Sequence, residues 1–142
     1  MTEYELAALF YQIVDVANAT MANFLAVTFA MMVVCYLAAH KLDRVSSALV
    51  LALYVLYAVG MIHEMYSEYR DLVGIGSEIA RSATHADSSL TWHGFALAGP
   101  NAVGQFIPVW VAIMGGLALF GTIWFFFHMR RRRSAANRIL SD

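Results

Sequence analysis

The sequence predicts an all-α integral membrane protein: a three-transmembrane-helix bundle with short helical extensions and one packed loop on the outer face. Of its 142 residues, 61% are hydrophobic and 13% are charged, whereas a soluble domain carries roughly 45–50% apolar and about 25% charged residues. Three long segments, 16–40, 45–63 and 88–129, contain no Asp, Glu, Lys or Arg. Each is long enough for the roughly 20 apolar residues that a helix needs to cross a bilayer. We therefore expect a single membrane domain over residues 1–142.

The first element is an amphipathic outer helix at about residues 3–18. Its apolar residues, among them Leu6, Phe10 and Ile13, recur at helical spacing. The face opposite them is acidic, which does not favour adsorption to a lipid surface. We expect this helix to run into the first transmembrane span, at about 21–40.

The second span, at about 45–63, is expected to continue outward as a helix to about residue 82. Its extension places Met65, Tyr69 and Leu72 near helical spacing, and we expect this face to pack against the apolar face of the first extension. Gly74 and Gly76 are expected to end or kink the helix.

The third span is expected at about 106–128, with Pro108 in its first turn, where the missing N–H costs nothing. The segment 83–104 is the one long loop, and its Trp92 and Phe95 predict that it packs on the outer surface. The last segment, 129–142, is expected to be a basic cytoplasmic tail.

Basic residues predict the orientation. They gather in the link between the first two spans and after the third span, which lie on the same face of a three-span protein. The positive-inside rule then places the N-terminus outside and the C-terminus in the cytoplasm of a multi-pass cytoplasmic (inner) membrane protein. The same residues are candidates for topology determination and for contact with anionic lipids in the bilayer: Lys41, Arg44, Arg130, Arg131, Arg132 and Arg133.

Histidines and acids on the outer side form a candidate metal site. Imidazole and carboxylate donors suit zinc or a similar divalent ion, and folding of the loop onto the end of the second span would gather them. The alternative interpretation is a polar network at the interface without metal. A haem site is a further alternative, against which stands the lack of a histidine in the middle of any span. The candidate ligands are His63, Glu64, His85, Asp87 and His93.

Small residues recur at a spacing of four in the spans. This pattern lets helix backbones approach closely, which drives association where the hydrophobic effect between helices is absent. It fits either packing among the three spans of one chain or packing against a partner. The candidate packing residues are Ala22, Ala26, Ala30, Ala48, Ala52, Ala112 and Gly116.

No catalytic motif accompanies these features, and Cys35 lies within a span without a base at its depth. We therefore expect a non-enzymatic protein without a resident cofactor, acting as a small assembly or accessory subunit through helix–helix association. Its expected partners are the lipid bilayer and a second copy or a larger membrane complex, but no nucleic acid. The alternatives are an oligomeric channel or permeability protein and a metal- or haem-binding subunit on the outer face.

Overall fold

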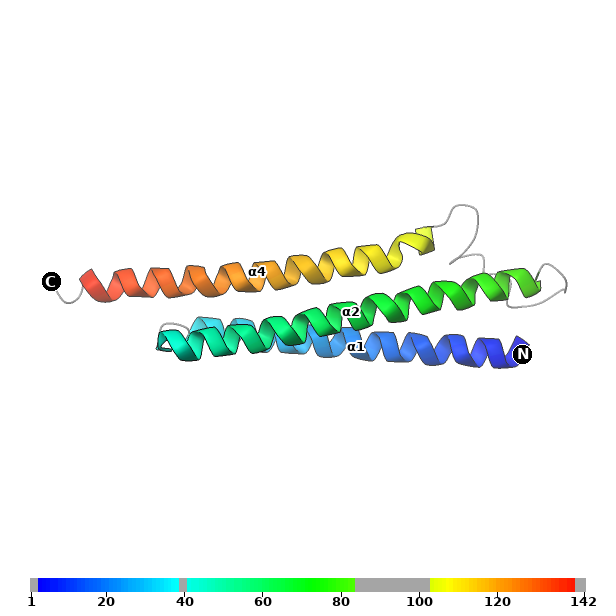
Figure 1. The fold of residues 1–142 in the computed structure, drawn as a ribbon, viewed down its shortest axis with the longest axis horizontal. Coiled ribbons are helices and arrows are strands. Elements are labelled where there is room, and N and C mark those ends of the chain that lie inside the picture. The colour runs from blue at the N-terminus through cyan, green and yellow to red at the C-terminus, as the bar shows by residue number, and fades with distance from the viewer. Residues whose placement is uncertain (1–2, 39–40, 84–102, 140–142) are drawn as a thin grey trace. The chain divides into compact units, whose positions relative to one another are not determined.

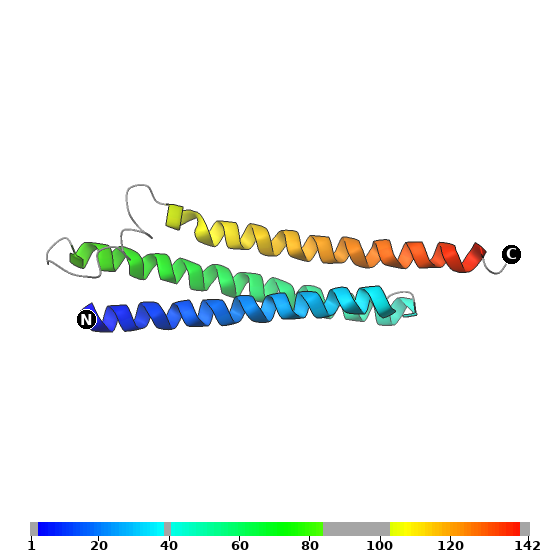
Figure 2. The same cartoon turned by 180° about the vertical axis from the view of Figure 1, so that it is seen from behind.

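In the computed structural model, the described part of the chain consists of three long helices, whose course can be followed in Figures 1 and 2. They are α1 (Glu3–Ala38), α2 (Arg44–Ala83) and α4 (Val103–Ile139). The structure describes residues 3–38, 41–83 and 103–139, and this part of the chain contains no strand. The predicted fold class is confirmed, because all three helices are long and apolar enough to cross a membrane.

Each helix is longer than one bilayer crossing. The helices α1, α2 and α4 have 36, 40 and 37 residues, or about 54–60 Å at the rise of an α-helix. The hydrocarbon core is only about 30 Å thick. The three predicted spans therefore lie within longer helices, and α1 runs without interruption from the predicted extension through the predicted span.

The end of α2 agrees with the predicted end at about residue 82, whereas the start of α4 differs from the prediction. Gly74 and Gly76 do not end α2, which continues to Ala83. Glycine costs about 1 kcal/mol in a helix, and the packing of neighbouring residues against α1 offsets that cost. Pro108 lies inside α4 rather than in its first turn, because the helix already begins at Val103.

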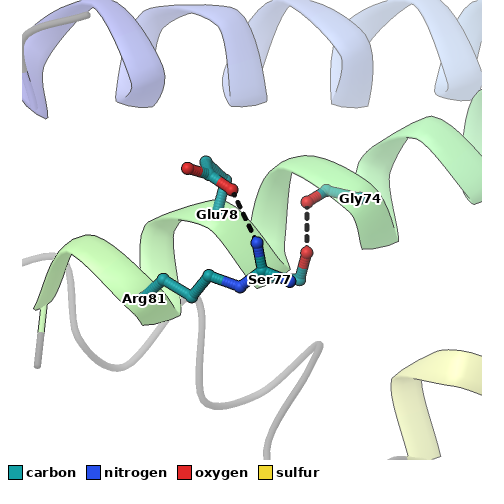
Figure 3. A network of polar contacts seen from close by, with 4 residues as sticks. All are labelled: Gly74, Ser77, Glu78 and Arg81. Carbon is teal, nitrogen blue, oxygen red and sulfur yellow. Dashed lines mark hydrogen bonds and ion pairs between the residues drawn. The ribbon is translucent and has the colours of Figure 1, made fainter.

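The last turns of α2 carry a short polar network (Figure 3). The hydroxyl of Ser77 donates a hydrogen bond to the carbonyl oxygen of Gly74 at 2.6 Å. Arg81 and Glu78 form an ion pair at 3.6 Å, with both side chains largely exposed. Such exposed pairs contribute little to stability, so these two contacts support the end of α2 locally.

Buried residues follow a repeat of three and four residues along each helix, which is the pattern of helices packed side by side. On α1 these are Leu6, Phe10, Ala17, Thr20, Phe24, Thr28, Met31 and Cys35. On α2 they are Ser47, Tyr54, Ala58, Met65, Leu72, Gly76 and Ile79. On α4 they are Gly104, Pro108, Gly115, Leu119, Thr122 and Phe126.

The chain divides into two compact units, and each helix contributes a segment to both. The first unit comprises Met1–Met21 and Ile62–Ile113. In it, the start of α1 lies beside the end of α2, and four buried side chains form a core. Half-buried Ile13, Val14 and Ile75 pack against that core. The predicted packing of the two helical extensions is thus confirmed for Leu6, Phe10, Ile13 and Leu72, whereas this core contains Ile79 in place of the predicted Met65 and Tyr69.

The second unit comprises Ala22–Met61 and Met114–Asp142. Its buried apolar side chains come from all three helices: Phe24, Met31, Cys35, Tyr54, Ala58, Leu119 and Phe126. The large apolar side chains on the outer sides of the helices are exposed, which is typical of helices surrounded by lipid.

The link between α1 and α2 ends in a helix cap. The backbone N–H of Ser46 donates a hydrogen bond to the Asp43 carboxylate at 2.9 Å. This is the bond that an N-cap residue makes with the third helical residue. Hydrogen bonds from the Ser46 side chain and backbone hold the pKa of the Asp43 carboxyl below its usual value. The cap fixes where α2 begins.

Candidate functional site

A carboxylate joins α1 and α2 within the first unit. The hydroxyl of Thr20 donates a hydrogen bond to Oε1 of Glu68 at 2.9 Å, in a partly buried position. The second carboxylate oxygen, Oε2, is buried and has no hydrogen-bond partner among the residues that the structure describes. Thr20 is itself buried, between the packed faces of the two helices. The pair is thus a specific polar contact between segments 48 residues apart in the chain, with one acceptor left over.

A second polar contact lies within the second unit. The hydroxyl of Tyr54 on α2 donates to Oγ1 of Thr28 on α1 at 3.4 Å, and both residues are buried. The hydroxyl of Ser47 is also buried, and no partner for it is present in the described part of the chain. The hydroxyl of Thr122 donates a hydrogen bond to the Ala118 carbonyl oxygen of the same helix at 2.8 Å. Thr28, Ser47, Tyr54 and Thr122 are therefore enclosed by the chain itself, whereas Asn23 and Tyr36 of the first predicted span are exposed.

The small residues predicted for helix packing differ in burial from one helix to another. Ala22, Ala26 and Ala30, here called the alanine stripe of α1, are all exposed. Phe24 and Thr28 are buried, and each lies two residues from Ala26, or about 200° around the helix. The alanine stripe thus faces away from the side of α1 that packs within the chain.

The other predicted packing residues lie on α2 and α4. Ala48 and Ala52 on α2 are exposed, whereas Ala112 and Gly116 on α4 are half-buried. A Cβ atom added to Gly116 would meet nothing within 4 Å. This glycine does not serve a close approach between helices of the chain, and its packing role stays a prediction.

The basic residues of the predicted cytoplasmic face lie in the link, at the start of α2 and along α4. Lys41, Arg44 and Arg131 are exposed and Arg130 is half-buried. Arg132 and Arg133 belong to α4 as well, because the helix continues to Ile139. The segment predicted as a basic tail is thus helical over most of its length.

The predicted metal ligands are only partly described. His63 and Glu64 are exposed on α2, while His85, Asp87 and His93 lie outside the described residues. Among the residues that the structure describes, no three His, Cys, Asp or Glu side chains come together as a metal site requires. The metal site therefore stays a prediction.

A ring pair at the end of the third predicted span was not anticipated from the sequence. Trp124 and His128 stack with centroids 5.0 Å apart and planes inclined by 19°. Trp124 is largely exposed and His128 is half-buried. The signal was present as the spacing of four between an aromatic residue and a histidine, which places both on one face of a helix.

Together these features define an α-helical protein with three helices able to span a membrane. Comparison with protein families, with curated proteins and with solved structures finds no match.

Proposed function

We propose that this protein is a non-enzymatic, multi-pass inner-membrane protein that acts as a small assembly or accessory subunit, associating with a second copy or with a larger membrane complex. The observation that carries the proposal is the exposed alanine stripe of α1. The charge asymmetry of the sequence supports an N-terminus outside and a C-terminus in the cytoplasm.

Side-chain size distinguishes the alanine stripe from the surfaces expected to meet lipid. On α2 the exposed side chains include Leu49, Leu53 and Leu56, which fill space among acyl chains. Alanines expose little side chain and let another backbone approach closely, and close approach is the main source of helix–helix attraction in a bilayer.

The polar residues of the spans favour this function over a channel. A pore formed between chains needs polar groups on the surfaces that line it. Thr28, Ser47, Tyr54 and Thr122 are buried within the chain and are not available to line a pore between copies, which leaves Asn23 and Tyr36 as the exposed polar side chains of the first span. We therefore rank an oligomeric channel below the assembly function. Ion flux measured through a symmetric oligomer would favour the channel function instead.

The test is a pair of substitutions in α1. Ala26→Leu adds bulk in the middle of the alanine stripe, and Leu25→Phe adds bulk at an exposed position about 100° away. Oligomeric state and copurifying proteins are measured after mild solubilisation, by native mass spectrometry and proteomics. We expect Ala26→Leu to change the assembly without altering the thermal stability of the isolated chain, because Ala26 is exposed. Identical assemblies for the wild type and Ala26→Leu would overturn the proposal.

The metal alternative has its own measurement. Elemental analysis at neutral pH without chelators, with a visible spectrum for haem, is compared between the wild type and His93→Ala. Close to one metal ion per chain that disappears in His93→Ala would move the metal-binding function ahead of the assembly function.

A further inference from the structure

On the side of α4 opposite its buried face, the side chains change from apolar to aromatic and then to cationic at the end of the membrane span. Leu117 and Phe120 are exposed apolar side chains, and they are followed on the same side by Trp124, His128 and Arg131. The last three stand at positions i, i+4 and i+7, which lie one above another on a helix. The side therefore passes from wholly apolar to aromatic and then to cationic within about three turns.

This change matches the layers of a bilayer surface. The distance from Trp124 to Arg131 is about 10 Å along the helix axis. The polar headgroup layer on each side of the hydrocarbon core is roughly 5–8 Å thick. With the Trp124 indole at the edge of the hydrocarbon, where tryptophan is enriched, His128 and Arg131 stand at the depth of the lipid phosphates.

We propose that Trp124, His128 and Arg131 form a binding site for the phosphate group of an anionic phospholipid. Arg131 is an exposed guanidinium, and planar guanidinium donors match phosphate oxygens. The Trp124–His128 stack engages the face of the imidazole ring. The ring nitrogens lie at its edge, and imidazole carries an N–H donor in either charge state. The stack thus holds the histidine donor in a defined orientation beside the cation.

The proposal goes beyond the assembly function and does not depend on it. It also differs from general attraction between the arginine run and an acidic membrane. General attraction depends on the number of charges and not on their place around the helix. A site depends on which arginine is present and on His128.

The experiment measures lipid binding to the full chain in detergent by native mass spectrometry, titrating phosphatidylglycerol against phosphatidylcholine. We expect one phosphatidylglycerol per chain to bind with preference. Arg131→Gln should weaken that binding by about fivefold, the factor that corresponds to about 1 kcal/mol for one basic residue at a membrane. Arg133→Gln is the matched control, because it removes the same charge about 200° around the helix. It should weaken binding by less than about twofold, which is well below the effect of one full basic residue.

Substitutions at the ring pair complete the test. His128→Leu should weaken phosphatidylglycerol binding, whereas His128→Gln, which keeps an N–H donor, should retain most of it. Trp124→Leu keeps an apolar side chain but removes the stack, and it should weaken binding as His128→Leu does. Equal losses in Arg131→Gln and Arg133→Gln, with no effect of His128→Leu, would overturn the site in favour of general attraction. Displacement of the lipid by millimolar inorganic phosphate would overturn the lipid as the occupant and assign the site to a soluble phosphate.

Discussion

The hydrogen bond between Thr20 and Glu68 gives the sharpest test of how α1 and α2 pack. Thr20→Val removes the hydroxyl donor with little change in shape. A hydrogen bond to a charged group contributes about 1.5–3 kcal/mol, but in membrane proteins the average is about 0.6 kcal/mol. Because Glu68 is half-buried and water reaches part of it, we expect Thr20→Val to lower the free energy of unfolding by about 1–2 kcal/mol.

A matched control separates this bond from the loss of a buried hydroxyl. Thr122 is as buried as Thr20, but its hydroxyl donates to the Ala118 carbonyl of its own helix. Thr122→Val therefore removes no contact between helices, and we expect it to cost well under the effect of Thr20→Val.

The partner residue completes a double-mutant cycle. Glu68→Met removes both carboxylate oxygens, including the buried Oε2 that lacks a partner in the described structure. The Thr20 hydroxyl is then free to bond the carbonyl one turn earlier on α1. We expect Glu68→Met to cost less than Thr20→Val, and the double variant to reveal a coupling of about 1 kcal/mol.

The assay is equilibrium unfolding in mixed micelles, followed by far-ultraviolet circular dichroism and repeated for all four members of the cycle. Residues without a direct contact add to within about 0.3–0.5 kcal/mol. A coupling energy inside that interval would refute the reasoning, because it would mean that the two side chains do not stabilise each other.

Three further predictions follow from other contacts and from the charge pattern. Tyr54→Phe should cost about 0.6 kcal/mol, the average for a hydrogen bond between membrane helices, and a destabilisation above 2 kcal/mol in the same assay would show a larger role for that hydroxyl. Asp43→Ala should raise the hydrogen-exchange rate of the Ser46 amide, and Asp43→Asn, which keeps an acceptor but loses the charge, should raise it less. The pKa of Asp43 is lowered in the folded chain. The stabilisation by the cap is therefore present above the unfolded pKa and is lost as the pH falls through the folded pKa. If protection of the Ser46 amide in the wild type does not fall at acidic pH, the charged Asp43 carboxylate is not what stabilises the cap. For topology, an impermeant thiol reagent should label Ser88→Cys and not Ser141→Cys from outside the cell, and the reverse pattern would invert the orientation.

Composition and periodicity were sufficient to predict the class and the packed extensions. Charge-free segments of about 20 residues leave a helix in lipid as the simplest arrangement. The spacing of Leu6 and Phe10 determines which side of α1 is apolar, and that side packs against Leu72 in the structure. These predictions depend on local pattern alone.

The effect of the two glycines in α2 and the long-range polar contacts were not predictable in the same way. Gly74 and Gly76 are breakers by intrinsic preference, yet α2 continues because Leu72, Ile75 and Ile79 pack around them. Tertiary packing outweighs a cost of about 1 kcal/mol for each glycine. The pairing of Thr20 with Glu68 depends on the register between two helices, which neither helix determines alone.

The repeat of three and four residues among the buried positions limits how the length of the protein can change. One residue inserted into α1 would rotate every later side chain by about 100°. The alanines at 22, 26 and 30 would then turn toward α2, and Phe24 would turn out of the packed face. An insertion of seven residues restores the faces but moves the chain by about 10 Å along the axis, a third of the hydrocarbon thickness. Within the span, related sequences should therefore show no insertions at all, and in the part of α1 before residue 20 they should differ in length by whole heptads.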